Sequence, residues 1–406
     1  MRNFLFRFIL IYGCIVGNVT MANSTEKSMS MTTQESKVTI RLAGSGTAII
    51  DWGDGIESVT RELSTDLELR TDFNDYTHTY SDTSYHTIII RGQIITHFDC
   101  VLNQLTNLDV SKNDVLTNLE CSGNKLQNLD ISKNTVLTHL SCSSNQLTNL
   151  DVSNNVALKQ LNCYSNQLIN LDVSKNIALT YLGCSFNKLT SLDLSNNVVL
   201  TYLHCSSNKL TNLNISKNKK LAYLECSLNP LSNLDVSWNI ELTKLSCNFN
   251  QLKSLDVSKN TSLTDLDCGG NQLMELVVRN NKLLTRLICW DNQLTELDVR
   301  ENTMLRQLSC SDNQLSKLDA EKNIVLKELC CGKNRLRNLK INRNNVLSQL
   351  LCENNELSVS VLNTLFISLN DNKQSFKAVS IFNNPGTFGC DHRIATSKGW
   401  KVFASV

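Results

Sequence analysis

Thirteen cysteines recur along the chain at a constant interval of 21 residues. Cysteine in such numbers allows three kinds of chemistry: disulfide bonding, zinc coordination and nucleophilic attack by a thiolate. Zinc sites need closely spaced Cys or His ligands, and the chain contains no Cys-x-x-Cys pair and no ligand-spaced pair of histidines. We therefore predict no metal site and no cofactor. The thirteen are Cys100, Cys121, Cys142, Cys163, Cys184, Cys205, Cys226, Cys247, Cys268, Cys289, Cys310, Cys331 and Cys352.

The constant interval also argues against disulfide bonds. Side chains at one position of successive coils point the same way and lie about 4.8 Å apart, the spacing of paired strands. A disulfide needs Cβ atoms about 3.5–4.5 Å apart, whereas a free thiol in a row behaves as a small hydrophobe. We therefore expect thirteen buried, reduced thiols. Cys330 precedes a row member and should face solvent, and the sequence names no partner for Cys390.

The cysteines belong to a repeated unit with two halves, as residues 116–136 illustrate. The first half reads L-x-x-L-x-C-x-x-N and the second L-x-x-L-D-I-S-x-N. Leu119 and Cys121 alternate with period two, and Leu129 and Ile131 do so ten residues later. We therefore predict two short parallel strands per coil, one on each face, with corners closed by asparagines whose amides both donate and accept. Such a period is typical of a solenoid.

This pattern resembles the leucine-rich repeat family over about residues 93–357. The two-strand form is similar to the bacterial 21-residue class, and cysteine at a core leucine position is similar to the cysteine ladder of internalin J-like proteins. The resemblance implies a mainly β fold, a right-handed solenoid of about 13 coils. Members of such families commonly act as surface adhesins or host-interaction proteins. The repetition and the lack of a catalytic triad, a phosphate loop or paired acid–base carboxylates argue against an enzyme.

The N-terminal residues 1–22 are similar to a secretory signal peptide. Arg2 and Arg7 precede an apolar stretch, and a small-residue cleavage site ends at Ala22. The alternative is lipidation at Cys14, which would make the chain an outer-membrane lipoprotein with a lipid anchor. No other stretch is long and apolar enough for a membrane span. We therefore expect a secreted or cell-surface protein, and its net charge of +1 excludes a strongly basic nucleic-acid binder.

Two non-repetitive segments flank the solenoid, and each is expected to cap one end. Residues 23–37 are polar and predict a linker, and residues 38–92 predict a small β-sandwich. The W-G-D-G turn at 52–55 and the H-x-Y segment at 78–80 resemble a PKD-like module. Asp51 and Asp54 there would either bind calcium or satisfy backbone N–H groups in a turn. Residues 358–406 combine a helical pattern with short strands, an α/β cap.

A ligand site must be sought among the variable, outward-facing positions, because packing fixes the framework. Tyrosines occupy the position three before the cysteine in three consecutive coils. Clustered aromatics on a rigid face are typical binding hot spots for an extracellular protein or glycan. The alternative is a self-stacking tyrosine ladder on a structural surface protein or spacer without a specific ligand. The candidate residues are Tyr164, Tyr181, Tyr202, His204, Tyr223 and Glu225.

An aspartate row lies on the opposite face, where like charges at this spacing would repel. Hydrogen bonds to the backbone of the serine two residues on would offset the repulsion. A calcium ladder is the alternative, although each coil supplies one carboxylate. The row comprises Asp109, Asp130, Asp151, Asp172, Asp193, Asp235, Asp256, Asp298 and Asp319.

Overall fold

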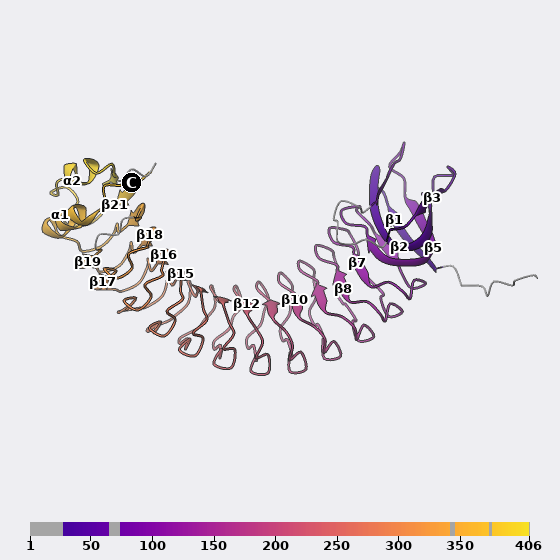
Figure 1. Cartoon of the computed structure of the whole chain (residues 1–406), viewed down its shortest axis with the longest axis horizontal. Helices are drawn as coiled ribbons and strands as arrows, with labels where there is room; N and C mark the ends of the chain where they lie inside the picture. Colours follow the sequence, from indigo (N-terminus) through magenta and orange to yellow (C-terminus); the bar gives the residue numbers. More distant parts are fainter. Residues whose placement is uncertain (1–26, 65–73, 342–345, 373–375, 406) are drawn as a thin grey trace, which may run out of the picture.

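The structure is a computed structural model that describes residues 27–64, 74–341, 346–372 and 376–405. The expectations for residues 1–22 and for Cys14 lie outside these residues. The repeats form a curved solenoid, with a β-module at the N-terminal end and a mixed cap at the C-terminal end (Figure 1). Short strands line the concave side of the arc, and turns form the convex side.

Each coil contributes one three-residue strand to the concave side, and neighbouring strands pair in parallel. The central leucines face one another, as Leu119 pairs with Leu140 and Leu140 with Leu161. The strands are β7 (Asn118–Glu120), β8 (His139–Ser141), β9 (Gln160–Asn162), β10 (Tyr181–Gly183), β11 (Tyr202–His204), β12 (Tyr223–Glu225), β13 (Lys244–Ser246), β14 (Asp265–Asp267), β15 (Arg286–Ile288), β16 (Gln307–Ser309), β18 (Glu328–Cys330) and β20 (Gln349–Leu351).

The second strand expected in each coil forms at only three places in the described residues: β6 (Asn107–Asp109), β17 (Lys317–Asp319) and β19 (Asn338–Lys340). β17 pairs with β19, and β6 pairs with the N-terminal module. The curvature explains the difference. Ladder hydrogen bonds fix the coil spacing on the concave side, so the convex side is spread beyond the reach of a regular ladder. Prediction of strands on both faces therefore holds in full only for the concave side.

Leucines and cysteines fill the interior, and two asparagine ladders close the corners. Leu119 and Cys121 have no exposed surface, as the period-two pattern predicts. On the cysteine side, Asn145 Nδ2 donates to Cys121 O at 3.0 Å and Cys142 O at 3.1 Å, and its Oδ1 accepts from Leu126 N at 3.0 Å. These bonds supply partners to backbone groups that no strand pairs, and they tie each coil to its neighbours.

The N-terminal module contains five strands: β1 (Lys27–Thr33), β2 (Lys37–Asp51), β3 (Val59–Glu62), β4 (Asn74–Thr79) and β5 (His86–Asp99). β1 lies within the predicted linker, so that prediction is wrong for residues 27–33. Met29, Met31 and Thr33 alternate inward there, a period-two signal in a polar segment. β1 pairs with β5 and β6. The end of β5 pairs with β7, so one strand crosses the predicted boundary at residue 92.

The C-terminal cap contains α1 (Val359–Ser368), β21 (Ala378–Ser380), α2 (Arg393–Thr396) and β22 (Lys401–Phe403). β21 and β22 extend the concave sheet beyond β20. Ser358 caps the start of α1 by accepting from Val361 N, and Lys398 Nζ donates to Phe366 O and Leu369 O at its end. A lysine at a helix C-terminus satisfies carbonyls that have no partner within the helix. Leu362, Leu365 and Phe366 bury the apolar face of α1.

Candidate functional site

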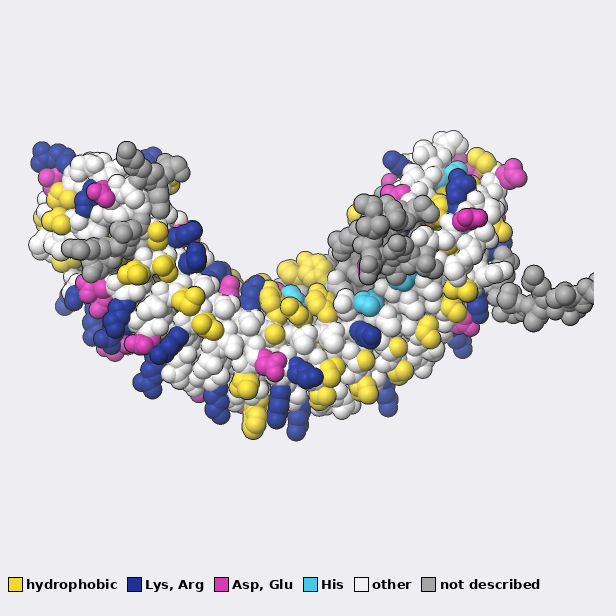
Figure 2. Space-filling model, viewed as in Figure 1, with side chains coloured by type: hydrophobic (Ala, Val, Ile, Leu, Met, Phe, Trp, Pro, Cys, Tyr) yellow, Lys and Arg dark blue, Asp and Glu magenta, His cyan; other side chains and the backbone are white. Residues whose placement is uncertain are grey.

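Three tyrosines lie side by side on adjacent strands of the concave face. Tyr181 on β10, Tyr202 on β11 and Tyr223 on β12 are direct partners in the parallel register. The ring centroids are 6.4 Å apart for the first pair and 5.6 Å apart for the second. Because successive coils repeat the same backbone, the rings point the same way, and Tyr202 is 46% exposed. Apolar and histidine side chains gather at this part of the concave edge (Figure 2).

His204 joins the tyrosines into one continuous surface. Its ring lies 5.5 Å from Tyr181 and 4.8 Å from Tyr223, nearly parallel to the latter. His204 follows Tyr202 by two residues on β11, so both side chains point to the same face of the sheet. We call Tyr181, Tyr202, His204 and Tyr223 the aromatic patch. Stacked rings of this kind are worth about 0.5–1.5 kcal/mol each beyond their buried area.

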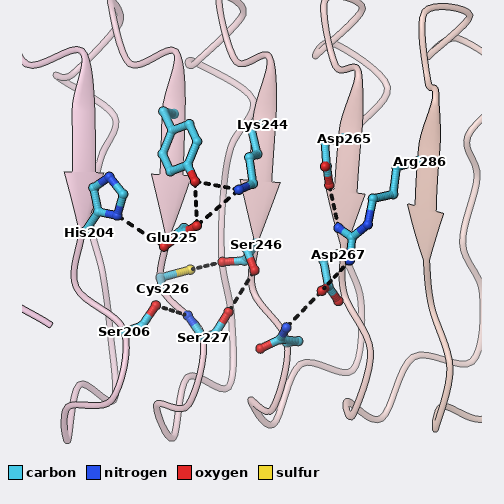
Figure 3. A network of polar contacts seen from close by, with 12 residues as sticks. His204, Ser206, Glu225, Cys226, Ser227, Lys244, Ser246, Asp265, Asp267 and Arg286 are labelled. Atoms are coloured by element: carbon cyan, nitrogen blue, oxygen red, sulfur yellow. Dashed lines mark hydrogen bonds and ion pairs between the residues drawn. The ribbon is translucent and has the colours of Figure 1, made fainter. Parts of the chain in front are cut away.

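Glu225 holds one side of the aromatic patch in place. It accepts from His204 Nδ1 at 3.1 Å, from the Tyr223 hydroxyl at 2.6 Å and from Lys244 Nζ at 3.2 Å (Figure 3). The hydrogen bond from His204 is the main reason that the pKa of Glu225 falls to about 2, against the opposing effect of burial. Lys244 also lies 4.5 Å from the centre of the Tyr223 ring. The carboxylate is therefore ionised at neutral pH and its charge is compensated by Lys244.

Charged side chains continue the concave face beyond the aromatic patch. Arg286 Nη1 lies 2.8 Å from Asp265 Oδ1, and its Nη2 lies 3.6 Å from Asp267 Oδ2. Asn248 donates to the same Asp267 oxygen at 3.0 Å. Sequence reasoning did not select Lys244, Asp267 or Arg286, although they occupy the same outward rows as the tyrosines and His204. Charge alternation between neighbouring coils along these rows was the available signal.

The six predicted site residues do not all meet. Tyr181, Tyr202, His204, Tyr223 and Glu225 form one network, whereas Tyr164 makes its ring contact with Phe186 at 5.2 Å. Tyr164 follows its cysteine by one residue, which places it at the corner after the strand. The tyrosines of the patch precede their cysteines by three residues. The two positions lie at opposite ends of the strand segment. Tyr164 therefore does not join the tyrosines of the patch, although its coil is next to theirs.

The aspartates considered as calcium ligands accept hydrogen bonds from backbone N–H groups in their own turns. Asp51 Oδ1 accepts from Gly53 N at 3.0 Å, and Asp54 accepts from Ile56 N at 3.1 Å and contacts His78 Nε2 at 2.7 Å. Burial alone would raise the pKa of Asp54, but the bonds from Ile56 and His78 lower it. No group of three or more His, Cys, Asp or Glu residues that could hold a metal ion occurs within the described ranges.

The aspartate row makes the local hydrogen bonds expected of it. Each of the nine carboxylates accepts from the backbone N–H two residues on, as Asp172 does from Ser174 N at 2.9 Å. The Ser174 hydroxyl and N–H lower the pKa of Asp172. The carboxylates are thus stabilised within their own coils, which offsets repulsion between coils.

The thirteen ladder cysteines are free and buried in the structure. Burial raises the pKa of these thiols, to about 12 for Cys163. Cys330 is half-buried rather than exposed, and burial raises its pKa to about 11. Because the thiolate is the reactive form, a raised pKa lowers the reactivity of these thiols at neutral pH. The thirteen ladder cysteines pack the core.

Similarity to a solved structure identifies the architecture. The functional domain of InlJ from Listeria monocytogenes, described as including a cysteine ladder, superposes with a TM-score of 0.64 and 36% sequence identity. The match covers 71% of this chain and 68% of that domain. This chain belongs to the cysteine-ladder class of leucine-rich repeat proteins. The cysteine row is the feature that this leucine-rich repeat protein shares with the description of that domain.

Other solved structures support the fold of this leucine-rich repeat protein at lower identity. An internalin (InlF) from L. monocytogenes matches with a TM-score of 0.62 and 20% identity, covering 77% of this chain and 87% of that one. A leucine-rich repeat protein of Leptospira interrogans matches with a TM-score of 0.55 and 24% identity, covering 65% and 79%. No family model matches the chain, and no curated protein matches it either. The comparisons do not support the PKD-like resemblance of the N-terminal module.

A helix that crosses a lipid bilayer must be long and predominantly apolar. Within the described ranges, no helix has both the length and the apolar composition that crossing requires. The two helices, α1 and α2, have 10 and 4 residues. A span needs about 20 residues.

Proposed function

We propose that this leucine-rich repeat protein is a secreted or surface-attached recognition protein, adhesin-like, that binds an extracellular protein or glycan on its concave face. It performs no catalysis in this proposal. The observation that carries it is the aromatic patch, in which three tyrosines and a histidine form one continuous, partly exposed surface on a rigid sheet. Tyrosines on a rigid, concave support are typical of binding hot spots, because they present a large contact area with few rotatable bonds.

The hydrogen bonds around Glu225 support a binding role. Glu225 and Lys244 hold the Tyr223 hydroxyl, and Glu225 also holds His204, so both rings are ordered before a partner arrives. Ordering side chains in advance reduces the entropy that association would otherwise lose. The solenoid supplies the same advantage at a larger scale, because each coil is fixed by its neighbours.

A structural spacer remains the second candidate, and one observation favours it. The tyrosines stack on one another, and cross-strand aromatic pairs contribute about 0.2–1 kcal/mol each to a sheet. A tyrosine ladder that serves only stability would bind nothing. The two functions therefore differ in what tyrosine removal does to binding rather than to stability.

The test is a screen of the purified chain on arrays of glycans and extracellular-matrix proteins, beside a Tyr181→Ser, Tyr202→Ser, Tyr223→Ser variant. We expect a hit whose affinity falls at least about a hundredfold in the variant, because hot-spot truncations cost about 2 kcal/mol or more each. Gln160→Ser with Gln349→Ser, at the same row in other coils, is the matched control and should bind normally. No hit at all, or a hit that the tyrosine variant retains, would favour the spacer.

A further inference from the structure

The residue two after each ladder cysteine occupies a corner with a left-handed backbone. All thirteen such residues have positive φ, from 51° at Phe249 to 68° at Gly123. Glycine adopts this conformation freely, and asparagine and aspartate tolerate it. The chain uses these types at five corners, as at Gly270, Asp291 and Asn354, and the small residue serine at three more.

Phe186, Leu228 and Phe249 depart from this rule in neighbouring coils, and Leu102 and Lys333 do so elsewhere in the solenoid. A bulky side chain in the left-handed region is a strained outlier. Burial would be the usual compensation, yet these three side chains are 51%, 49% and 47% exposed. They lie within four consecutive coils, with Ser207 as the one small residue between them. Three of these four neighbouring corners carry strained, exposed apolar side chains, and such a cluster motivates a hypothesis of function.

Two further aromatic rings complete this surface. Tyr164 packs edge-on against Phe186 at 5.2 Å, and Trp290 packs edge-on against Phe249 at 5.3 Å. We call Tyr164, Phe186, Leu228, Phe249 and Trp290 the corner ridge. It follows the strands of the concave sheet, whereas the aromatic patch lies on the strands themselves.

One coil lies between the coil of Phe249 and the coil of Trp290. At the two positions next to these rings, that coil carries glycines and therefore no side chains. A Cβ added at Gly269 would come within 2.8 Å of Trp290 Nε1, and one added at Gly270 within 2.8 Å of Phe249 Cδ1. The two rings therefore rest on bare backbone, one on each glycine. The sequence keeps two adjacent glycines at this one coil, so the Phe249–Trp290 pair is a built platform.

The polar groups beside this platform are planar and their charges are paired. Asn248 and Arg286 both contact Asp267, which also accepts from Gly269 N at 3.3 Å (Figure 3 shows Asp267 and Arg286). An anionic ligand would meet Asp267 and the exposed Asp291, which disfavours it. A neutral polyhydroxyl ligand suits both features, because sugar C–H groups pack on aromatic faces while hydroxyls bond to planar amides, carboxylates and guanidinium groups.

We propose that the corner ridge is a second binding site, for a neutral oligosaccharide that runs along the solenoid with sugar rings packed on the Phe249–Trp290 and Tyr164–Phe186 pairs. Coils repeat about every 4.8 Å on the strand side, close to the length of one pyranose residue in an extended chain. The ridge and the aromatic patch are separate sites, so failure of one proposal does not decide the other.

The test substitutes asparagine at the strained corners. Asparagine tolerates the left-handed backbone, so it relieves the strain, and it removes the apolar side chain that is proposed to bind the sugar. In a Phe186→Asn, Leu228→Asn, Phe249→Asn variant each new residue is of a type that the chain itself uses at Asn354 with φ 53°. Saturation-transfer NMR of the full chain with neutral hexasaccharides of glucose, mannose, galactose and N-acetylglucosamine is the readout. We expect transfer to at least one hexasaccharide, a loss of tenfold or more in affinity in the variant, and a Tm that is unchanged or higher.

Two controls fix the location. Leu102→Asn changes an equally left-handed, 74% exposed leucine outside the ridge and should leave binding intact. The Tyr181→Ser, Tyr202→Ser, Tyr223→Ser variant should also keep hexasaccharide binding. The proposal is overturned by absence of transfer to every hexasaccharide, by binding that survives in the asparagine variant, by loss of binding in the tyrosine variant, or by a variant Tm several degrees lower.

Discussion

On the concave side, neighbouring coils are joined by a strand ladder, whereas on the convex side most of the aspartate hydrogen bonds stay within one coil. The two asparagine ladders follow the same division. Asn208 on the cysteine side donates to the carbonyls of Cys184, Cys205 and Ser206 and accepts from Leu189 N. Asn197 in the other ladder donates to two carbonyls, but its Oδ1 is buried without a hydrogen-bond partner. The concave side is thus the more completely bonded, and it is the side that carries the aromatic patch.

The largest expected effect distinguishes the two ladders directly. Asn208→Ala leaves three buried backbone groups without a partner, and at about 1–3 kcal/mol each we expect a loss of about 4 kcal/mol in stability. Asn197→Ala removes two bonds and also a buried oxygen that has no partner, so we expect about 2 kcal/mol. Urea denaturation of both variants measures the difference. Equal losses would mean that the acceptor oxygen of the cysteine-side ladder contributes nothing.

The next effect concerns the buried thiols of the concave side. Cys205→Ser places a hydroxyl in an apolar position with no exposed surface, so we expect a loss of about 2 kcal/mol. Cys330→Ser is the matched control, because the half-buried Cys330 side chain reaches solvent, and it should change stability little. Thermal unfolding of both variants is the measurement. A stable Cys205→Ser protein would show that the row tolerates polar groups and is retained for another reason.

Glu225 gives the concave side an acid-sensitive contribution. Its folded pKa of about 2 lies below the usual 4.5, so its contribution is fully present above pH 4.5 and is lost as the pH falls towards 2. Because the side chain is 30% exposed, we expect about 1 kcal/mol. Glu225→Gln should flatten the stability profile between pH 5 and 2. Identical acid unfolding of variant and parent would show that Glu225 makes no pH-dependent contribution to stability.

The smallest effect is expected on the convex side. The folded pKa of Asp172 is lowered by Ser174, so its contribution is present above its usual pKa of 3.8 and lost as the pH falls below it. Asp172→Asn keeps the turn acceptor and should leave Tm unchanged at pH 7, whereas Asp172→Ala should lower it slightly. Added calcium or chelator should not alter Tm in either protein. A calcium-dependent rise in the parent that Asp172→Ala reduces would reinstate the calcium ladder.

Much of the fold was predictable because burial repeats with the sequence. Leu119, Cys121 and Asn124 recur at fixed spacing, and each position has one environment in every coil. The convex strands were overpredicted because Leu129 and Ile131 alternate inward whether or not a ladder forms between coils. Alternation reports which side chains are buried, whereas strand pairing depends on the curvature of the whole array. The strand β1 was missed because its polar composition masked a short alternation.

The candidate site was predictable where one row holds the residues. Tyr181, Tyr202 and Tyr223 share a position in consecutive coils, so register alone brings them together. The contacts of Glu225 with Lys244 and His204 depend on how far long side chains reach across coils, which spacing does not specify. Backbone strain at Phe186 and Phe249 is likewise a property of the folded corner and has no signature in residue type alone.

Because a continuous strand ladder is present only on the concave side, the two edges of the solenoid differ in stiffness. Hydrogen bonds between strands hold the inner edge at a fixed length, while the outer edge is joined mainly by side chains such as Asn197. Bending that changes the radius of the arc is therefore softer than stretching along the inner edge.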